Sequence, residues 1–228
     1  MTSRTSNASR LPQVTVIKLG GSLAESWRLA SILRIVTATR VPVAVVPGGG
    51  TFADAVRVAQ AELDFSDAVA HRMAIMAMHQ TALMLAGLEP RFVPVETMAR
   101  IRRELANGSI PVWLPWKLSE RDTAIPADWS ITSDGLAARL AERLGGAPVV
   151  LVKSCPILAG ATLDRLALAG AVDPTFVTIV ERARLVWRVL GAGEEKELAT
   201  LLSSAACPAP SREVRRRGAP PRAIARRK

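Results

Sequence analysis

Tyrosine is absent from this 228-residue sequence, and aromatic residues make up only 4% of it. A hydrophobic core must therefore be built largely from Ala, Val, Leu and Ile, which suits helices packed on a parallel β-sheet. Cysteine is also scarce: Cys155 and Cys207 offer neither the ligand spacing of a metal site nor a disulfide framework. We therefore expect a protein of the reducing cytoplasm whose side chains form no dedicated metal site.

Long apolar runs are missing as well. No stretch approaches the ~18 uninterrupted apolar residues of a membrane helix, and residues 1–10 lack the apolar core of a signal peptide. We therefore expect a cytoplasmic protein with no membrane contact. Hydrophobic residues nevertheless make up 49% of the chain, which is enough for one large α/β domain or two closely joined lobes.

The net charge of +10 is unevenly distributed. Residues 208–228 contain eight Lys or Arg residues and one acid, and two more arginines lie in residues 1–10, so the sequence between them is close to neutral. Because the tail is rich in Pro, Gly and Arg, we predict that it is disordered. Alternatively, the tail makes weak electrostatic contact with nucleic acid or an acidic surface. We divide the chain into a flexible segment 1–12, a globular domain 13–207 and the basic tail 208–228.

Short β-branched runs alternate with segments of helical periodicity along the globular domain. Thr51 is the predicted N-cap of the second helix, the methionine-rich stretch 73–84 is predicted to lie in the core, and residues 115–129 are predicted to form a loop or crossover. The order of strand and helix predicts a three-layer α/β/α fold with a mainly parallel central sheet. We predict strands at residues 14–19, 41–46, 91–95, 110–114, 149–152 and 185–190, and helices at 23–39, from 51 through 58, 66–87, 96–106, 135–144 and 194–202.

Two glycine-rich segments each follow a predicted strand, KLGGS at residues 18–22 and PGGG at residues 47–50. In parallel α/β sheets, ligands bind beyond the carboxyl ends of the strands. Glycine lets backbone amides approach a phosphate closely, and a helix N-terminus and the Lys18 ammonium add positive charge. Neither segment fits the Walker A pattern or the dinucleotide-binding pattern, which disfavours a Rossmann dehydrogenase. The sequence therefore predicts two phosphate-binding loops.

Phosphoryl transfer requires little covalent chemistry from a protein. It needs donor and acceptor held in line, with positive charge and oriented amides around the moving group, and one glycine loop for each partner meets that need. Lys18 ends a predicted buried strand, where an unpaired lysine is costly, and Lys153 ends another apolar run. We therefore predict that both lysines are functional.

Together with TSD at residues 132–134, before a predicted helix, the two glycine segments form three motifs in order. These motifs resemble those of the amino acid kinase superfamily, and the resemblance extends over about residues 13–202. The superfamily includes uridylate, aspartate, acetylglutamate and isopentenyl phosphate kinases. The resemblance implies an amino acid kinase-like fold with an acceptor lobe at about 13–126 and a nucleotide lobe at about 127–207. It also implies a homo-oligomer that uses ATP and Mg²⁺.

The resemblance assigns roles to individual residues. It implies that Lys18 contacts the transferring phosphoryl group and that Asp134 orients the lysines or the magnesium shell. Lys153 would be a second cation on the phosphates or a nucleotide contact only. Among the remaining residues, Gly20, Gly21, Ser22 and Ser154 would face the nucleotide, and Gly48, Gly49 and Gly50 would hold the acceptor and its phosphate.

The sequence leaves two interpretations open for several polar residues. Asp134 is alternatively only a helix cap, and Asp173 is a turn residue or part of a site. His71 either contacts the acceptor or lies on a helix surface. Asp54 and Arg57 either face the mouth of the second glycine loop and bind the acceptor, or form a salt bridge on an exposed face.

Four stretches resemble one branch of the superfamily in particular: residues 47–57, 70–78, 128–134 and 151–154. This branch is the aminomethylfuran-methyl phosphate kinases of methanofuran biosynthesis. The resemblance implies that ATP phosphorylates aminomethylfuran-methyl phosphate to the diphosphate. The alternatives are another phosphomonoester kinase, for uridylate or isopentenyl phosphate, a non-catalytic nucleotide-binding or oxyanion-storing protein, and an RNA-binding module that uses the basic tail.

Overall fold

The computed structural model describes residues 14–158 and 160–203. The predicted flexible N-terminus and the basic tail lie outside these described residues. Six strands form one sheet in the order β3-β4-β2-β1-β5-β6, and each neighbouring pair is parallel, which confirms the predicted sheet. The strands are β1 (Thr15–Leu19), β2 (Val43–Pro47), β3 (Phe92–Val95), β4 (Ile110–Trp113), β5 (Val149–Val152) and β6 (Trp187–Leu190).

The sheet buries both of its faces, because successive side chains of a strand point to opposite sides. In β1, Val16 belongs to one hydrophobic cluster and Ile17 to the other, and Val149 and Val150 of β5 divide in the same way. This double burial explains why the central strands are continuous runs of Val, Ile and Leu. It also confirms the three-layer α/β/α architecture.

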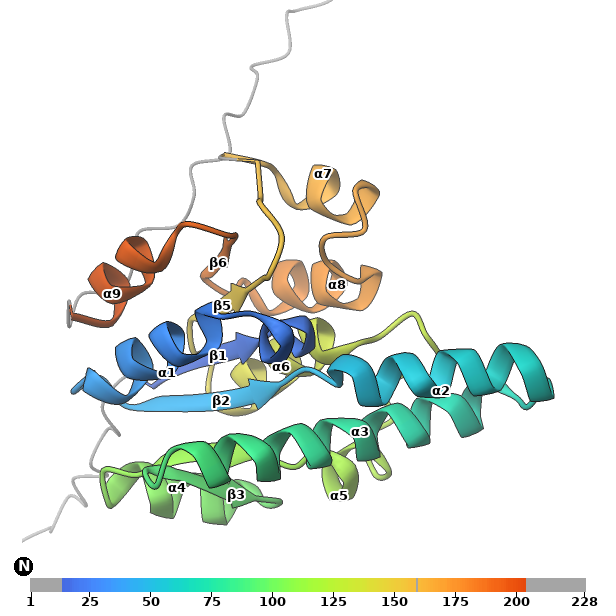
Figure 1. Cartoon of the computed structure of the whole chain (residues 1–228), viewed down its shortest axis with the longest axis horizontal. Coiled ribbons are helices and arrows are strands. Elements are labelled where there is room, and N and C mark those ends of the chain that lie inside the picture. The colour runs from blue at the N-terminus through green and yellow to red at the C-terminus, as the bar shows by residue number, and fades with distance from the viewer. Residues whose placement is uncertain (1–13, 159, 204–228) are drawn as a thin grey trace, which may run out of the picture.

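Helices cover the two faces of the sheet. Residues of α1 and α9 pack into the cluster that contains Ile17, and those of α6 and α8 into the cluster that contains Val16. Figure 1 shows α2 and α3 as a long pair that lies side by side and extends past the ends of the strands. The described helices are η1 (Gly21–Glu25), α1 (Arg28–Ala38), α2 (Gly50–Leu63), α3 (Asp67–Leu88), α4 (Met98–Ala106), α5 (Trp116–Ser119), α6 (Ser133–Arg143), α7 (Leu163–Leu168), α8 (Pro174–Ala183) and α9 (Glu195–Ser203).

Helices α5, α7 and α8 lie in regions where the sequence pattern predicts a loop or assigns nothing. α7 and α8 are short, and capping residues define their starts better than periodicity does. Thr162 accepts a hydrogen bond from the Arg165 backbone, and Asp173 accepts one from the Phe176 backbone. Pro174 follows Asp173 at the first helical position, where proline is favoured because no intrahelical N–H is needed there.

Two local predictions are wrong. Thr51 lies inside α2, whose N-cap is Gly49, so the glycine triplet leads directly into the helix. The methionine-rich stretch is only partly in the core: Met78 is 4% exposed, but Met73 and Met76 are 37% and 55% exposed. The reason is that α3 packs one side against the rest of the domain and leaves the side that carries Met73 and Met76 uncovered.

The predicted lobes share this single sheet, since β1 to β4 precede residue 126 and β5 and β6 follow it. Their boundary stays a prediction. No helix in the described ranges is both long enough and apolar enough to cross a membrane.

Candidate active site

The two predicted glycine loops touch at the carboxyl ends of adjacent strands. β1 and β2 pair in register to their last residues, so the loops leave the sheet side by side. A Cβ atom on Gly48 would lie 2.2 Å from the Gly21 amide nitrogen, and a Cβ atom on Gly21 would lie 1.9 Å from the Gly50 amide nitrogen. Gly50 also has a φ of 55°, which disfavours other residues. Glycine is therefore required for the contact between the loops, besides its suitability for binding phosphate.

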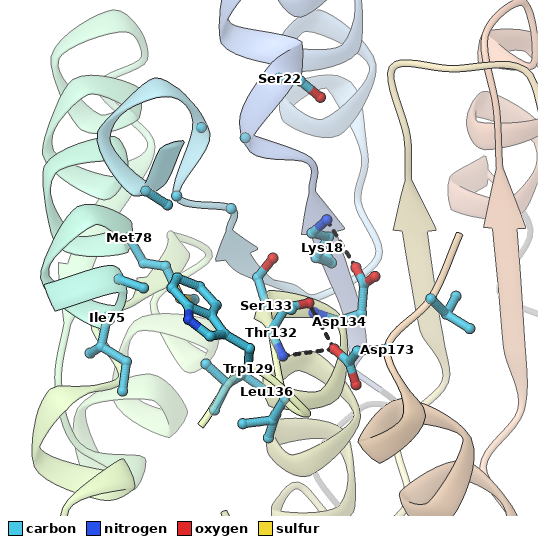
Figure 2. A pocket seen from close by; sticks show the side chains of 18 of the residues that line it. Lys18, Ser22, Ile75, Met78, Trp129, Thr132, Ser133, Asp134, Leu136 and Asp173 are labelled. Atoms are coloured by element: carbon cyan, nitrogen blue, oxygen red, sulfur yellow. Dashed lines mark hydrogen bonds and ion pairs between the residues drawn. The ribbon is translucent and has the colours of Figure 1, made fainter. Parts of the chain in front are cut away.

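Two buried lysines share one buried aspartate beside these loops. Lys18 in β1 is 6% exposed, and Asp134 in the first turn of α6 is 3% exposed. Asp134 Oδ1 lies 2.9 Å from Lys18 Nζ, and Asp134 Oδ2 lies 2.5 Å from Nζ of Lys153, the residue after β5. Figure 2 shows the Lys18 ammonium and the Asp134 carboxylate facing each other where the strands end. The three residues that we predict to be catalytic thus lie in one cluster.

The alternative in which Asp134 only caps a helix is wrong. α6 begins at Ser133, and Thr132 is its N-cap, with Thr132 Oγ1 accepting from the Asp134 backbone. The Asp134 side chain instead lies between two cations, which is the condition under which a carboxylate can be buried. The contact of Oδ1 with Lys18 is an ion pair without hydrogen-bond alignment, so this oxygen has no hydrogen-bond partner among the described residues.

The lysine charges keep Asp134 ionised. Burial alone raises the pKa of this carboxyl, but Lys18 and Lys153 outweigh burial, and the pKa lies below its usual value. The pKa of Lys153 is lowered, first by burial and then by the like charge of Lys18, and Asp134 opposes both effects. With both lysines protonated, the cluster carries one net positive charge at a place where a phosphate can reach it.

Asp173 holds the segment that carries Asp134. Asp173 Oδ2 accepts hydrogen bonds from the Thr132 backbone at 2.8 Å, the Thr132 hydroxyl at 2.7 Å and the Gly135 backbone at 2.9 Å. Burial, followed by the nearby charge of Asp134, raises the pKa of Asp173, although these hydrogen bonds oppose the shift. Both interpretations of the sequence therefore apply: Asp173 caps α8 and also borders the cavity.

Two further contacts fix the end of β5. Ser22 Oγ lies 2.6 Å from Ser154 Oγ, which joins the first glycine loop to the residue after Lys153. Arg28, which the sequence pattern did not single out, is 6% exposed. Its guanidinium donates to the Lys153 carbonyl oxygen at 3.1 Å and pairs with Glu195. These contacts fix the backbone from which the Lys153 ammonium extends.

A cavity of about 480 Å³ opens between the lysine cluster and the α2–α3 pair. Asp54 and Arg57 line it and also form the predicted exposed ion pair, at 2.6 Å, so the salt-bridge interpretation is confirmed, and binding of the acceptor stays a prediction. His71 lines it too, and because it is only 6% exposed, the helix-surface interpretation is wrong. Of the other predicted site residues, Gly20 and Ser154 are not in the cavity wall, whereas Gly21, Ser22, Gly48, Gly49, Gly50 and Lys153 are.

A family model described as "Amino acid kinase family" matches residues 13–158. The chain belongs to the amino acid kinase family. The matched segment includes both glycine loops, Asp134 and Lys153, and it ends before Asp173 and before helices α7 to α9.

Two individual proteins resemble this chain. The [5-(aminomethyl)furan-3-yl]methyl phosphate kinase of Methanocaldococcus jannaschii is 27% identical over 138 residues, which are 60% of this chain and 63% of that protein. A crystal structure of uridylate kinase from Archaeoglobus fulgidus superposes with a TM-score of 0.56 at 19% identity, covering 81% of this chain and 93% of that one. The structural likeness confirms the fold.

The two histidines of the chain predict how the stability of the folded protein depends on pH. Burial, together with Arg72, lowers the pKa of His71 against the opposing charge of Asp128, and burial lowers that of His79 against Glu96. Below the usual histidine pKa of about 6.5, the unfolded chain binds protons that the folded chain does not. The neutral imidazoles therefore make their full contribution to stability above pH ~6.5, and this contribution decreases as the pH falls.

We expect the melting temperature to rise between about pH 5 and pH 7, and the slope to decrease in His71→Gln and in His79→Gln. His79→Gln tests the imidazole whose Nε2 accepts from the Trp116 backbone at 3.2 Å. The measurement is a series of thermal melts in buffers of equal ionic strength. An unchanged slope in the double variant would contradict this prediction, because the chain contains no other histidine.

Proposed function

We propose that this chain is an ATP-dependent phosphotransferase whose acceptor is a small phosphomonoester. The observation that carries the proposal is the cluster of Lys18, Asp134 and Lys153 beside two glycine loops in direct contact. Loops in contact can present two phosphate groups to each other, and the buried ammonium groups can neutralise the charge that moves between them.

The nucleotide side of the proposed site is the first loop with the end of β5. Gly20, Gly21 and Ser22 would cradle the ATP phosphates, and Ser154 supports this wall through its contact with Ser22. Lys153, fixed through its backbone by Arg28, would neutralise the phosphates from the β5 side. Gly20 has a structural part as well, because its amide donates to the carbonyl oxygen of Val152 at 2.9 Å.

Lys18 would contact the transferring phosphoryl group, and Asp134 would keep the two lysines in place. Without Asp134, two ammonium groups in a buried site would repel each other. Asp134 permits both charges to be present before substrate binds. This arrangement provides preorganised charge at the point where the transition state requires it.

The acceptor side is the second loop with the α2–α3 pair. Gly48, Gly49 and Gly50 would hold the acceptor phosphate, and Arg57 at the cavity rim and the buried His71 would contact the acceptor. Asp54 would orient Arg57 through their ion pair. Since a phosphate acceptor is already ionised at neutral pH, the reaction needs no general base.

Magnesium fits this site as the companion of the nucleotide. Mg²⁺ in kinases is held by one or two carboxylates together with substrate phosphates and water. Because both oxygens of Asp134 contact the lysines, this carboxylate would hold the ion through its water shell, and the hydrogen bonds of Asp173 commit that side chain to the start of α6. When bound, Mg²⁺ neutralises charge on the nucleotide phosphates.

The acceptor that we propose is aminomethylfuran-methyl phosphate, converted to the diphosphate in methanofuran biosynthesis. The relative from M. jannaschii, whose name specifies this substrate, supports the choice. Uridylate and isopentenyl phosphate are the competing acceptors.

The test is ATP turnover by the purified protein with the three acceptors offered in parallel, followed by mass spectrometry of the diphosphate products. We expect product only with the furan phosphate. Turnover with another acceptor would retain the phosphotransferase and reject the pathway. A tight ATP complex without transfer to any acceptor would favour the nucleotide-binding or oxyanion-storing alternative.

A truncated protein that ends at residue 207 tests the alternative in which the basic tail binds RNA. We expect this truncated protein to keep full turnover and to lose any affinity for RNA. Loss of turnover on truncation would show that the basic tail belongs to the enzyme site.

We further propose that the protein is a homo-oligomer. Support comes from an apolar surface of α3, where Val69, Met73, Met76 and Leu83 are between 37% and 62% exposed. Light scattering after size-exclusion chromatography should give a mass of at least two chains, and Met76→Glu should shift it toward one.

A further inference from the structure

The Trp129 indole is held firmly at the cavity although its residue lies in an irregular segment before α6. Its Nε1 donates to Gln60 Oε1 of α2 at 2.8 Å, and the Arg57 guanidinium lies 4.6 Å from the ring centroid. The two contacts join α2 to the segment that leads to Asp134. Neither Trp129 nor Gln60 carries a sequence signal of this role.

Gln60 is itself fixed. Its amide nitrogen donates to Asp67 Oδ1 at 2.7 Å and to the Phe65 carbonyl oxygen at 3.2 Å, while its amide oxygen accepts from Trp129. All of its hydrogen-bonding groups are thus engaged, and the side chain cannot turn toward a ligand without losing bonds. The consequence is that the plane of the indole is set before any ligand arrives.

Part of the surroundings of the indole is apolar. Figure 2 shows the Trp129 ring between the helix that carries Ile75 and Met78 and the helix that carries Leu136, and all four side chains line the cavity. Near it, His71 provides an imidazole whose pKa is lowered, mainly by burial, and whose Nε2 has no hydrogen-bond partner within the described ranges. This compartment offers one flat aromatic surface and aliphatic contacts beside polar side chains that include Arg57, His71 and Ser133.

We propose that Trp129 is a specificity-determining residue, forming the wall against which a small flat ring of the phosphate ester packs. The inference rests on the proposed assignment of this side of the cavity to the acceptor. A polar group of the acceptor that faces Ile75, Met78 or Leu136 would lack a hydrogen-bond partner there, which is costly. A single aromatic ring would gain ring contact and lose no hydrogen bonds.

Arg57 connects ring recognition to phosphate recognition. Its guanidinium is restrained by Trp129 on one side and by Asp54 Oδ1 at 2.6 Å on another. A side chain restrained in this way loses less conformational entropy when it binds a phosphate. Gln60 therefore acts as a positioning residue for the indole, whereas Arg57 would itself contact the acceptor.

The test uses calorimetric binding of two probes, benzyl phosphate and inorganic phosphate, to the full chain without nucleotide. We expect wild-type protein to bind benzyl phosphate about tenfold more tightly than inorganic phosphate. Trp129→Ala should reduce this ratio to about one and weaken phosphate binding much less than benzyl phosphate binding, because Asp54 still restrains Arg57, and Trp129→Phe should keep most of the ratio. Gln60→Leu should lower the ratio partially, whereas Gln80→Leu, an exposed glutamine of α3, should leave it unchanged.

A wild-type ratio near one would overturn the inference, and so would an unchanged ratio in Trp129→Ala. If Trp129→Ala does not fold, Gln60→Leu decides, because an unchanged ratio in that variant would also overturn the inference. ATP turnover is measured separately on the same proteins. If the affinity ratio depends on Trp129 but no turnover is found, the proposed kinase function is rejected and the aromatic wall is retained. If turnover is found but the affinity ratio does not depend on Trp129, only the aromatic wall is rejected.

Discussion

Lys18→Met is expected to lower kcat by about 1,000-fold with a much smaller change in the KM for ATP, because a buried cation that stabilises the moving phosphoryl group acts chiefly in the transition state. Methionine retains the length and apolar stem of lysine and removes only the ammonium. The fold should persist, since Asp134 keeps its ion pair with Lys153 at 2.5 Å. The measurement is steady-state turnover with the preferred acceptor, accompanied by a thermal melt.

Lys117→Met is the matched control. Lys117 is 60% exposed and pairs with Glu96 on the surface, so its loss should leave kcat unchanged. If Lys18→Met kept more than roughly a tenth of wild-type kcat while remaining folded, Lys18 would not stabilise the transition state to the extent expected of a phosphate-neutralising cation.

The sequence predicts a functional residue best when its neighbours in the chain already indicate its role. Lys18 ends an apolar run and precedes two glycines, so burial, charge and turn chemistry point to the same role within a few residues. The parallel sheet was predictable for the same reason, because its central strands are buried on both faces and need almost continuous Val, Ile and Leu.

The residues that sequence reasoning missed depend on partners far away in the chain. Arg28 pairs with Glu195, and Gln60 fixes Trp129, across separations of 167 and 69 residues. No local pattern distinguishes such a glutamine or tryptophan from a surface residue. For Asp173, the following Pro174 indicates a helix start, but its bonds to Thr132 appear only in the fold.

The glycine loops show a mixed outcome. Their positions after β1 and β2 were predicted, and so was a phosphate-binding role. Their contact was not, because it depends on β1 and β2 being neighbours in the sheet. The same contact explains why Thr51 is not a cap: the chain must turn at Gly49 and Gly50 to pass the first loop, and α2 has already begun when it reaches Thr51.

Gly48→Ala should therefore cause a large loss of stability. The added Cβ would lie 2.2 Å from the Gly21 nitrogen and 2.9 Å from the Gly21 Cα. Both are backbone atoms, so relief requires the two loops to separate. We expect a decrease in the free energy of unfolding of roughly 3 kcal/mol, measured by urea denaturation, together with loss of ATP binding in the fraction that remains folded.

Gly87→Ala provides the opposite case in the same chain. Gly87 lies in α3, and a Cβ there would meet no atom within 4 Å, so alanine should stabilise the protein by about 0.5–1 kcal/mol through its higher helix propensity. If Gly48→Ala lowers the free energy of unfolding and Gly87→Ala raises it, the close approach of the two loops, and not a general effect of replacing glycine, explains why position 48 requires glycine. If Gly48→Ala were as stable as wild type and still bound ATP, the two loops would not be in contact in solution. Binding of the two phosphates would then depend on the lysines alone.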